Sequence, residues 1–254
     1  QGIASDRGSP FFRVKDLLAN KEEADKLAGA LAPSAPDFDE ENSLLAEAGL
    51  RLLWQGHPEL RVDEAAVRQG LAMRPPCRFE VREVEVGVDA PQAVAAPRGV
   101  PGGGEKKTGV TVVLDAAHNP PAIASFFHKL AKEFRGRRFR VVAAFSRDKE
   151  SKVCLSSVLK IAGPDRIHLA EASTPRATPA VQLASTLAEI SGGKFDASRR
   201  VRTGSQSVRE AVRDALNEAA LSGAEGSEKD MVVICGTVFM MVDAREEIGI
   251  IEPQ

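Results

Sequence analysis

The chain has 254 residues, of which 43% are hydrophobic and 28% are charged, and its formal net charge at pH 7 is -2. This balance is ordinary for a globular protein and supplies no global basic field for nucleic acid or an anionic membrane. No apolar run approaches the ~20 residues needed to span a bilayer, and the three cysteines form no C-x-x-C pair that would suggest a zinc site. We therefore expect no nucleic-acid or membrane partner, and a reducing location that is cytoplasmic or organellar.

The first 77 residues are expected to be mainly helical and to end in a rigid linker. Apolar residues recur there at helical spacing, and prolines and glycines separate the helical stretches. Helices are predicted over residues 12–32, Asp39–Trp54 and Val62–Leu71, the last with Asp63 as its N-cap. The proline-containing segment Met73–Arg78 is interpreted as a hinge between two domains, residues 1–77 and 78–254.

The amino terminus suggests part of a longer protein. The chain begins at Gln1, without Met, a signal peptide or a transit-peptide pattern. We interpret it as a fragment entered midway, and a processed or trimmed terminus is the alternative.

Strands and helices alternate after the linker. Apolar and charged residues alternate over Phe79–Val88, as in a half-exposed strand, and residues 89–108, rich in Ala, Pro and Gly, are interpreted as a flexible surface insertion. Strands are then predicted at 110–114, 138–145, 166–171, 199–202 and 231–236, and helices at 120–135, 150–162, 178–192, 205–221 and 237–247. This order predicts an α/β fold with a mostly parallel, Rossmann-like sheet flanked by helices. The strands at 110–114, 138–145 and 231–236 are the most hydrophobic and should be central.

The turn after the first of these parallel strands, Leu114–Pro121, is the most informative segment. Ligands of open α/β sheets bind at the carboxyl ends of the strands, where such turns lie. Asp115 can hydrogen-bond ribose hydroxyls, and His118, three residues later, can reach the same ligand through a phosphate or a base. In the alternative interpretation, Asp115 and Asn119 only cap the helix that follows.

Three further turns should fall on the same rim. The segment Phe145–Glu150 concentrates charges of both signs directly after a hydrophobic strand. Arg176 lies between prolines on a stiff loop, which suits a clamp for carboxylate or phosphate, although a plain solvated arginine is the alternative. Thr237 follows Gly236, and its hydroxyl can contact a ligand or cap the last helix.

Other signals in the sequence carry little weight. Residues 99–108 resemble the phosphate-binding pattern G-x-x-x-x-G-K-[ST], but Glu105 stands where Lys is required, and the segment precedes a strand. His57, His128 and His168 show no metal-ligand spacing, so no metal site is predicted. Cys154 and Cys235 are interpreted as small core residues.

The turn Leu114–Pro120, which reads Leu-Asp-Ala-Ala-His-Asn-Pro, resembles the L-D-G-A-H-N-P signature of the folylpolyglutamate synthase and dihydrofolate synthase family, whose members are Mur ligase relatives. Other segments match in the family's order. Asn42 is similar to the Asn that opens the last helix of the central ATPase domain, and Pro76–Glu80 is similar to the family's P-G-R-F-E linker. Three later turns also match family motifs: Phe145–Lys149 is similar to G-A-L-x-D-K-D, Pro175–Pro179 to P-R-A-x-x-P, and Gly236–Phe239 to G-S-L-Y. Several matches in one order make the resemblance specific.

The resemblance implies an ATP-dependent amide ligase. In that family ATP phosphorylates a carboxylate of folate or dihydropteroate, and the amine of L-glutamate then attacks the acyl phosphate. By resemblance, Asn42, Arg78 and Asp115 contact ATP, His118 is the catalytic residue at the same site, and Arg176 and Thr237 bind substrate. The true P-loop and the Mg²⁺ ligands belong to a domain that is not visible in this sequence.

The resemblance also implies a division of the chain. Residues 1–77 would be the helical end of the central ATP-binding domain with its linker, and residues 78–254 the C-terminal ligase domain. Cys77 and Ala116 replace family glycines, and Thr237 replaces a serine. We expect a monomer that is inactive alone. The alternatives are a Mur-type ligase for a cell-wall precursor, which the folate-like linker argues against, and a non-catalytic module that binds a nucleotide or a partner protein.

Overall fold

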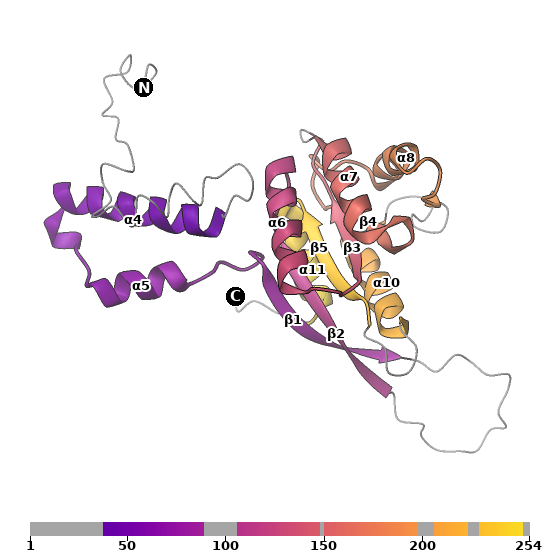
Figure 1. Ribbon diagram of the computed structural model, residues 1–254, viewed down its shortest axis with the longest axis horizontal. Coiled ribbons are helices and arrows are strands. Elements are labelled where there is room, and N and C mark those ends of the chain that lie inside the picture. The colour runs from indigo at the N-terminus through magenta and orange to yellow at the C-terminus, as the bar shows by residue number, and fades with distance from the viewer. Residues whose placement is uncertain (1–37, 89–105, 148–149, 198–205, 223–228, 251–254) are drawn as a thin grey trace, which may run out of the picture. The chain divides into compact units, whose positions relative to one another are not determined.

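The computed structural model describes residues 38–88, 106–147, 150–197, 206–222 and 229–250 (Figure 1). It divides the chain into two compact units, Gln1–Pro75 and Pro76–Gln254. The predicted helix at 12–32, the predicted strand at 199–202 and the charged residues Asp148 and Lys149 lie outside the described residues.

The first unit contains two described helices, which are the second and third of the predicted ones. Helix α4 (Phe38–Gly56) is followed by the short 3-10 helix η1 (Pro58–Leu60) and by α5 (Glu64–Ala72). The Asp63 carboxylate accepts a hydrogen bond from the Ala66 N–H at 2.7 Å, so Asp63 is the predicted N-cap of α5. Among the described residues of this unit, Leu44, Ala48 and Val67 are the buried hydrophobic ones.

The second unit is built on a five-stranded sheet with the order β1-β2-β5-β3-β4. The strands are β1 (Glu80–Val88), β2 (Lys106–Asp115), β3 (Phe139–Ala144), β4 (Ile167–Leu169) and β5 (Met231–Gly236). β1 pairs with β2 in the antiparallel sense, and the other pairings are parallel. The prediction of a mostly parallel sheet is confirmed, and β2, β5 and β3 are its three inner strands, as expected from their hydrophobicity.

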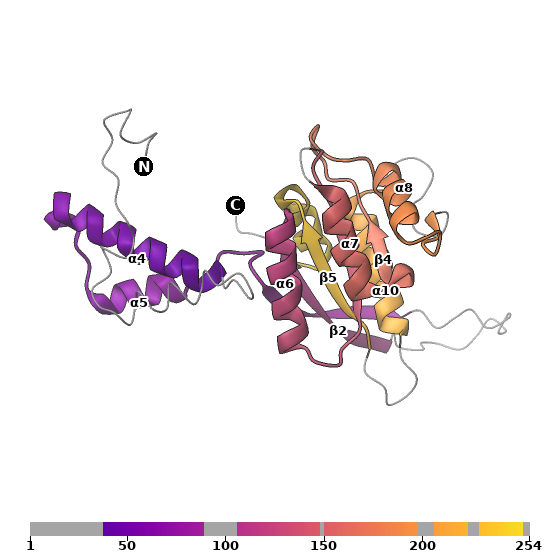
Figure 2. The ribbon, with the colours of Figure 1, turned by 45° about the horizontal axis from the view of Figure 1, so that its top comes forward.

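Helices cover both faces of this sheet (Figure 2). Alternate residues of each inner strand belong to different hydrophobic cores. On one face lie α6 (Pro120–Glu133), α7 (Ser151–Ala162) and α8 (Ala180–Ile190). On the other face lie α10 (Val208–Leu221) and α11 (Met241–Glu247). Two 3-10 helices, η2 (Pro164–Arg166) and η3 (Val238–Met240), precede β4 and α11 respectively. In β2, Val112 and Leu114 pack toward α10 and α11, whereas Val113 packs toward α6 and α7. Burial on both faces explains why the inner strands are continuously hydrophobic.

One expectation about element limits was wrong. The insertion predicted at 89–108 does not extend to residue 108, because β2 begins at Lys106 and Lys106–Thr108 pair with Val86–Val88 of β1. The final helix predicted at 237–247 is present; it begins as the 3-10 helix η3 and continues directly as α11.

None of the helices that the structure describes is long and apolar enough to cross a membrane.

Candidate functional site

The carboxyl ends of β3 and β5 meet at a close backbone contact that only glycine allows. Gly236 has φ +123°, and an ideal Cβ at this position would lie 1.9 Å from the Ala144 carbonyl oxygen. The same carbonyl accepts a hydrogen bond from the Thr237 N–H at 2.8 Å. Gly236 therefore lets the chain leave β5 directly against β3 and sets the position of the Thr237 hydroxyl.

Hydroxyl and guanidinium groups gather beside this contact. The Ser146 Oγ and the Thr237 Oγ1 lie 3.2 Å apart, and both residues are buried. The exposed Arg176 places its guanidinium carbon 5.9 Å from the centroid of the Phe239 ring, two residues after Thr237. The structure thus brings Arg176 and Thr237 to one part of the rim, as the sequence suggested, and it adds Ser146, which was not singled out individually.

The loop that carries Arg176 is fixed to the turn after β3 by hydrogen bonds. The Arg147 N–H donates to the Arg176 carbonyl oxygen at 2.9 Å, and the Arg147 Nε donates to the Ala177 carbonyl oxygen at the same distance. The Thr178 N–H donates to the Phe145 carbonyl oxygen at 2.8 Å. These bonds hold the Arg176 backbone while its side chain stays exposed.

Thr237 also has the structural role that was its alternative. Its Oγ1 accepts a hydrogen bond from the Phe239 N–H at 3.4 Å at the start of η3. A hydroxyl oxygen has two acceptor lone pairs and one proton, so this cap leaves it further hydrogen-bonding capacity.

The turn after β2 holds the second group of predicted residues. The Asp115 Oδ1 accepts from the Ala117 N–H and the Oδ2 accepts from the Phe79 N–H, each at 2.8 Å. Asn119, not Asp115, caps α6, since its Oδ1 accepts from the Ala122 N–H at 3.0 Å. The capping alternative is therefore right for Asn119 and wrong for Asp115, which instead fixes the residue that follows Arg78.

His118 is held in one orientation by its own turn. Its Nδ1 lies 2.9 Å from the Ala116 carbonyl oxygen. A carbonyl oxygen only accepts, so Nδ1 carries a proton and Nε2 is the acceptor nitrogen of the neutral ring. The half-buried His118 thus has one nitrogen available for proton transfer or for a ligand.

Arg78 and Asn42 lie in different units. The exposed Arg78 precedes Phe79 in the turn that leads into β1, next to Asp115. Asn42 is exposed on α4 of the first unit. α4 begins at Phe38, four residues earlier, so Asn42 does not open this helix, contrary to the position expected for it.

The cysteines and histidines outside these turns have structural environments. Burial raises the pKa of the Cys154 thiol to about 11, with the Glu150 charge as the second cause. Burial, followed by the charge of Asp115, raises the pKa of the Cys235 thiol still further. His128 is exposed on α6. Among the described residues, His, Cys, Asp and Glu side chains form no group of three that could hold a metal ion.

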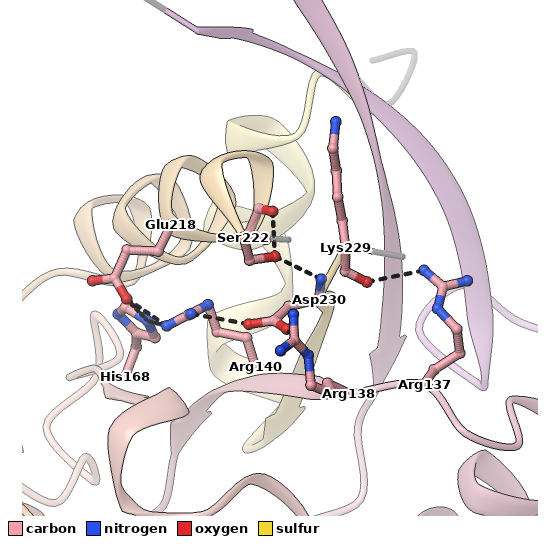
Figure 3. Close-up of polar contacts among 9 residues, drawn as sticks. Arg137, Arg138, Arg140, His168, Glu218, Ser222, Lys229 and Asp230 are labelled. Atoms are coloured by element: carbon pink, nitrogen blue, oxygen red, sulfur yellow. Dashed lines mark hydrogen bonds and ion pairs between the residues drawn. The ribbon is translucent and has the colours of Figure 1, made fainter. Parts of the chain in front are cut away.

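A buried charge network lies at the opposite, amino edge of the sheet, and sequence reasoning missed it (Figure 3). Arg140 of β3 contacts Asp230 through Nη2 at 3.0 Å, pairs with Glu218 of α10, and places Nη1 3.4 Å from the His168 Nε2. Arg138 also pairs with Asp230, at 2.9 Å. The available signal was an arginine inside the otherwise apolar strand Phe139–Ala144, because a buried charge requires a partner. This network lies at the opposite edge of the sheet from the strand-to-helix turns, so we interpret its role as stabilising the fold.

Comparisons with known proteins agree with this geometry. The family model described as "Mur ligase, glutamate ligase domain" matches residues 104–238, which cover β2 to the start of η3. No curated protein sequence matches the chain.

Solved structures of folylpolyglutamate synthases are similar to the chain. The Mycobacterium tuberculosis folylpolyglutamate synthase complexed with ADP is 26% identical, with a TM-score of 0.58, over 86% of this chain and 41% of that one. A second structure, with ADP and AMPPCP, is also 26% identical, with a TM-score of 0.54, over 83% and 41% of the two chains. Escherichia coli FolC in complex with DHPP and ADP, at 23% identity and a TM-score of 0.52 over 85% and 40%, shares the fold.

The chain spans about two fifths of the length of these solved structures. The resemblance to the folylpolyglutamate synthase and dihydrofolate synthase family is confirmed by the family model and the structural neighbours together. The chain belongs to the Mur ligase family and carries its glutamate ligase domain.

Proposed function

We propose that the chain is part of an ATP-dependent ligase that joins L-glutamate to folate or dihydropteroate through an acyl phosphate. The observation that carries this proposal is the arrangement of two groups on the carboxyl edge of a Mur ligase domain: Asp115 and His118 after β2, and Arg176 and Thr237 beside β3 and β5. The similar M. tuberculosis synthase binds ADP and AMPPCP. Residues 1–77 would then end the central ATP-binding domain with its linker, and 78–254 would form the ligase domain.

Asp115 and Arg78 are proposed to hold the nucleotide, and Asn42 is proposed as a nucleotide contact on the family resemblance alone. Each Asp115 oxygen accepts one backbone N–H. A carboxylate at the end of a strand suits the ribose hydroxyls of a nucleotide. Arg78 is exposed and directly precedes Phe79, whose N–H bonds to Asp115, and its guanidinium suits phosphate oxygens.

Arg176, Thr237 and His118 are proposed to serve the second substrate. The exposed Arg176 guanidinium can pair with a carboxylate of L-glutamate, and the Thr237 hydroxyl can bond to the same group. In the amide-forming step the glutamate nitrogen bonds to the acyl carbon, the bond from that carbon to the phosphate oxygen breaks, and phosphate leaves. The Nε2 of His118 is proposed to take the proton that the nitrogen loses.

Mg²⁺ is expected to assist ATP in this reaction, but the described residues do not gather a ligand set for it. Its ligands are therefore expected outside them, and no step assigned to the residues above requires the ion. The sequence also contains no complete G-x-x-x-x-G-K-[ST] loop. The 254-residue chain alone is accordingly expected to incorporate no glutamate.

The test is a ligation assay with the full-length natural protein, ATP, Mg²⁺ and radiolabelled L-glutamate. Dihydropteroate, tetrahydrofolate and a muramyl peptide precursor are offered separately as acceptors. Labelled product with either of the first two, formed together with ADP and phosphate, is expected. Product only with the muramyl acceptor would identify the protein as a cell-wall ligase. ATP binding without any product would favour a non-catalytic module.

A further inference from the structure

The turn that carries Arg78 has an unfavourable backbone on both sides of that residue. Cys77 has φ +59° and Phe79 has φ +50°, values in the left-handed region that residues with a Cβ seldom adopt. Phenylalanine is especially poorly suited to this region. Such a conformation persists only where the surrounding structure determines it strongly, and it occurs most often at functional sites.

The two flanking side chains are anchored on opposite faces of the sheet. Cys77 is buried in the core that includes α10 and α11. Phe79 packs against the core that includes α6, with its ring centroid 5.9 Å from that of Phe126 and 6.4 Å from that of Phe134. Lys129 of α6 places its Nζ 4.5 Å from the centroid of the Phe79 ring. Arg78, between the two anchors, is exposed.

Backbone bonds attach the same turn to the end of β2. The Ala116 N–H donates to the Cys77 carbonyl oxygen at 2.9 Å, and the Phe79 N–H donates to the Asp115 Oδ2 at 2.8 Å. The peptide units on both sides of Arg78 are thereby tied to the two residues that begin the Asp115 turn.

A nearly buried ion pair completes the attachment. The Cys77 N–H donates to the Glu80 Oε2 at 2.8 Å, and the same oxygen pairs with the Nη1 of Arg245 from α11. The side chains of Glu80 and Arg245 are only 10% and 11% exposed. Arg245 lies far along the chain from the turn, so helix α11 and the turn hold one another through this carboxylate.

We infer that Glu80 and Arg245 are positioning residues, which hold the turn in its left-handed conformation and so fix where the Arg78 side chain leaves the backbone. This inference rests on the proposed function, in which Arg78 contacts ATP. A side chain that is already oriented loses less conformational freedom on binding, so the ion pair increases nucleotide affinity without touching the nucleotide.

Cys77 provides a direct probe of the turn in the 254-residue chain. Arg245→Met removes the charge but keeps a side chain of similar length. Arg213→Met is the control, because Arg213 of α10, whose side chain is 59% exposed, pairs with Glu247 of α11 at 2.8 Å and 2.9 Å. The measurement is the rate of thiol alkylation at each cysteine, read by peptide mass spectrometry.

Arg245→Met should raise the alkylation rate of Cys77 by on the order of tenfold or more, since it leaves the Glu80 carboxylate without its buried cation. Cys154 and Cys235 should stay unreactive, and Arg213→Met should change none of the three rates. An unchanged Cys77 rate would overturn the inference. If all three cysteines of Arg245→Met react because the chain unfolds, Glu80→Gln is used instead. A faster Cys77 alkylation in Glu80→Gln would then support the inference, and an unchanged rate would overturn it.

A double-mutant cycle in the full-length natural protein separates positioning from simple structural support. Arg78→Ala, Arg245→Met and the double variant are compared by the dissociation constant of ADP and by the KM for ATP. Arg245→Met alone should weaken both by on the order of tenfold, because a small displacement of a contacting group has effects of this size or larger. The double variant should match Arg78→Ala.

The outcomes of the cycle distinguish the two proposals. If the losses multiply in the double variant, Arg245 does not act through Arg78, and the positioning role is wrong while the nucleotide role of Arg78 stands. If Arg78→Ala changes neither quantity, the assignment of Arg78 in the proposed function is wrong.

Discussion

The Asp115 carboxylate accepts a hydrogen bond from the Phe79 backbone N–H, which joins two residues 36 positions apart at a distance of 2.8 Å. The bond connects the end of β2 to the turn before β1, and it places the most informative residue of the sequence beside the linker arginine. Asp115 therefore has a structural role that coexists with its proposed nucleotide contact. A substitution at this position must change both.

Asp115→Ala should reduce ATP use in the full-length protein far more than His128→Ala, because His128 is exposed on α6. It should also lower the free energy of unfolding by roughly 1–3 kcal/mol, since the Phe79 and Ala117 N–H groups lose their acceptor. Steady-state kinetics and urea unfolding measure the two effects. Equal kinetic effects of the two variants would remove Asp115 from the site.

Gly236→Ala should be among the most destabilising small substitutions in the chain. The new Cβ would lie 1.9 Å from the Ala144 carbonyl oxygen, so β3 and β5 would have to separate at the site. We expect a loss of roughly 3 kcal/mol or more in the free energy of unfolding, from the combined strain and overpacking.

The matched control for Gly236→Ala is Gly136→Ala. Gly136 also has a positive φ, of +78°, but no atom lies within 4 Å of its ideal Cβ. Gly136→Ala should lower the free energy of unfolding by only ~1–2 kcal/mol, which is the cost of placing a residue with a Cβ in the left-handed region. Chemical denaturation measures the loss of stability in both variants. Similar losses would show that the contact with the Ala144 carbonyl adds nothing to the cost of Gly236→Ala.

Much of the sheet could be predicted because its inner strands are apolar on both faces. Val112, Val141 and Val232 lie in short hydrophobic runs that a parallel sheet explains, and each run is followed by a helical pattern. The start of β2 at Lys106 could not be predicted, since Lys106–Thr108 are strand only through pairing with β1. Local patterns carry no information on such pairing.

The site was predicted in its residues more than in its contacts. Asp115, Arg176 and Thr237 were found because turns at the carboxyl ends of strands meet at one edge. The left-handed Cys77 and Phe79 were not foreseen, because neither residue type favours this conformation and only distant anchors such as Arg245 impose it. The partners of Arg140 were missed for the same reason, since Asp230 lies 90 positions away.

The amino-edge network should contribute to stability rather than to catalysis. Asp230→Ala removes a 3%-exposed carboxylate from Arg140 and Arg138. Leaving the buried Arg140 without this partner should cost roughly 3–5 kcal/mol in the free energy of unfolding. Arg213→Met, which removes the pair that the exposed Arg213 makes with Glu247, should have little effect by comparison.

The double variant Arg140→Met/Asp230→Leu tests the origin of that loss. If the cost of Asp230→Ala comes from an uncompensated charge, removing both charges should restore part of the lost stability. Urea unfolding of the wild type, the single variants and the double variant gives the comparison. A double variant less stable than Asp230→Ala would show that the network stabilises the sheet through the ion pair itself.

The Glu80 carboxyl should make the linker turn sensitive to acid. Burial raises the pKa of this group, but the Cys77 N–H, Arg82 and Arg245 together outweigh burial and lower the pKa below its ordinary value. A group whose pKa is lower in the folded state stabilises that state above its unfolded pKa, ~4.3 for Glu, and loses the contribution as the pH falls through the folded pKa.

In Glu80→Gln this contribution is absent at every pH. The difference in unfolding free energy between the wild type and Glu80→Gln should therefore be constant near neutral pH and should shrink below about pH 4. Urea unfolding at a series of pH values measures it. A difference that stays constant down to the acid unfolding transition would show that the ion pair with Arg245 does not stabilise the turn.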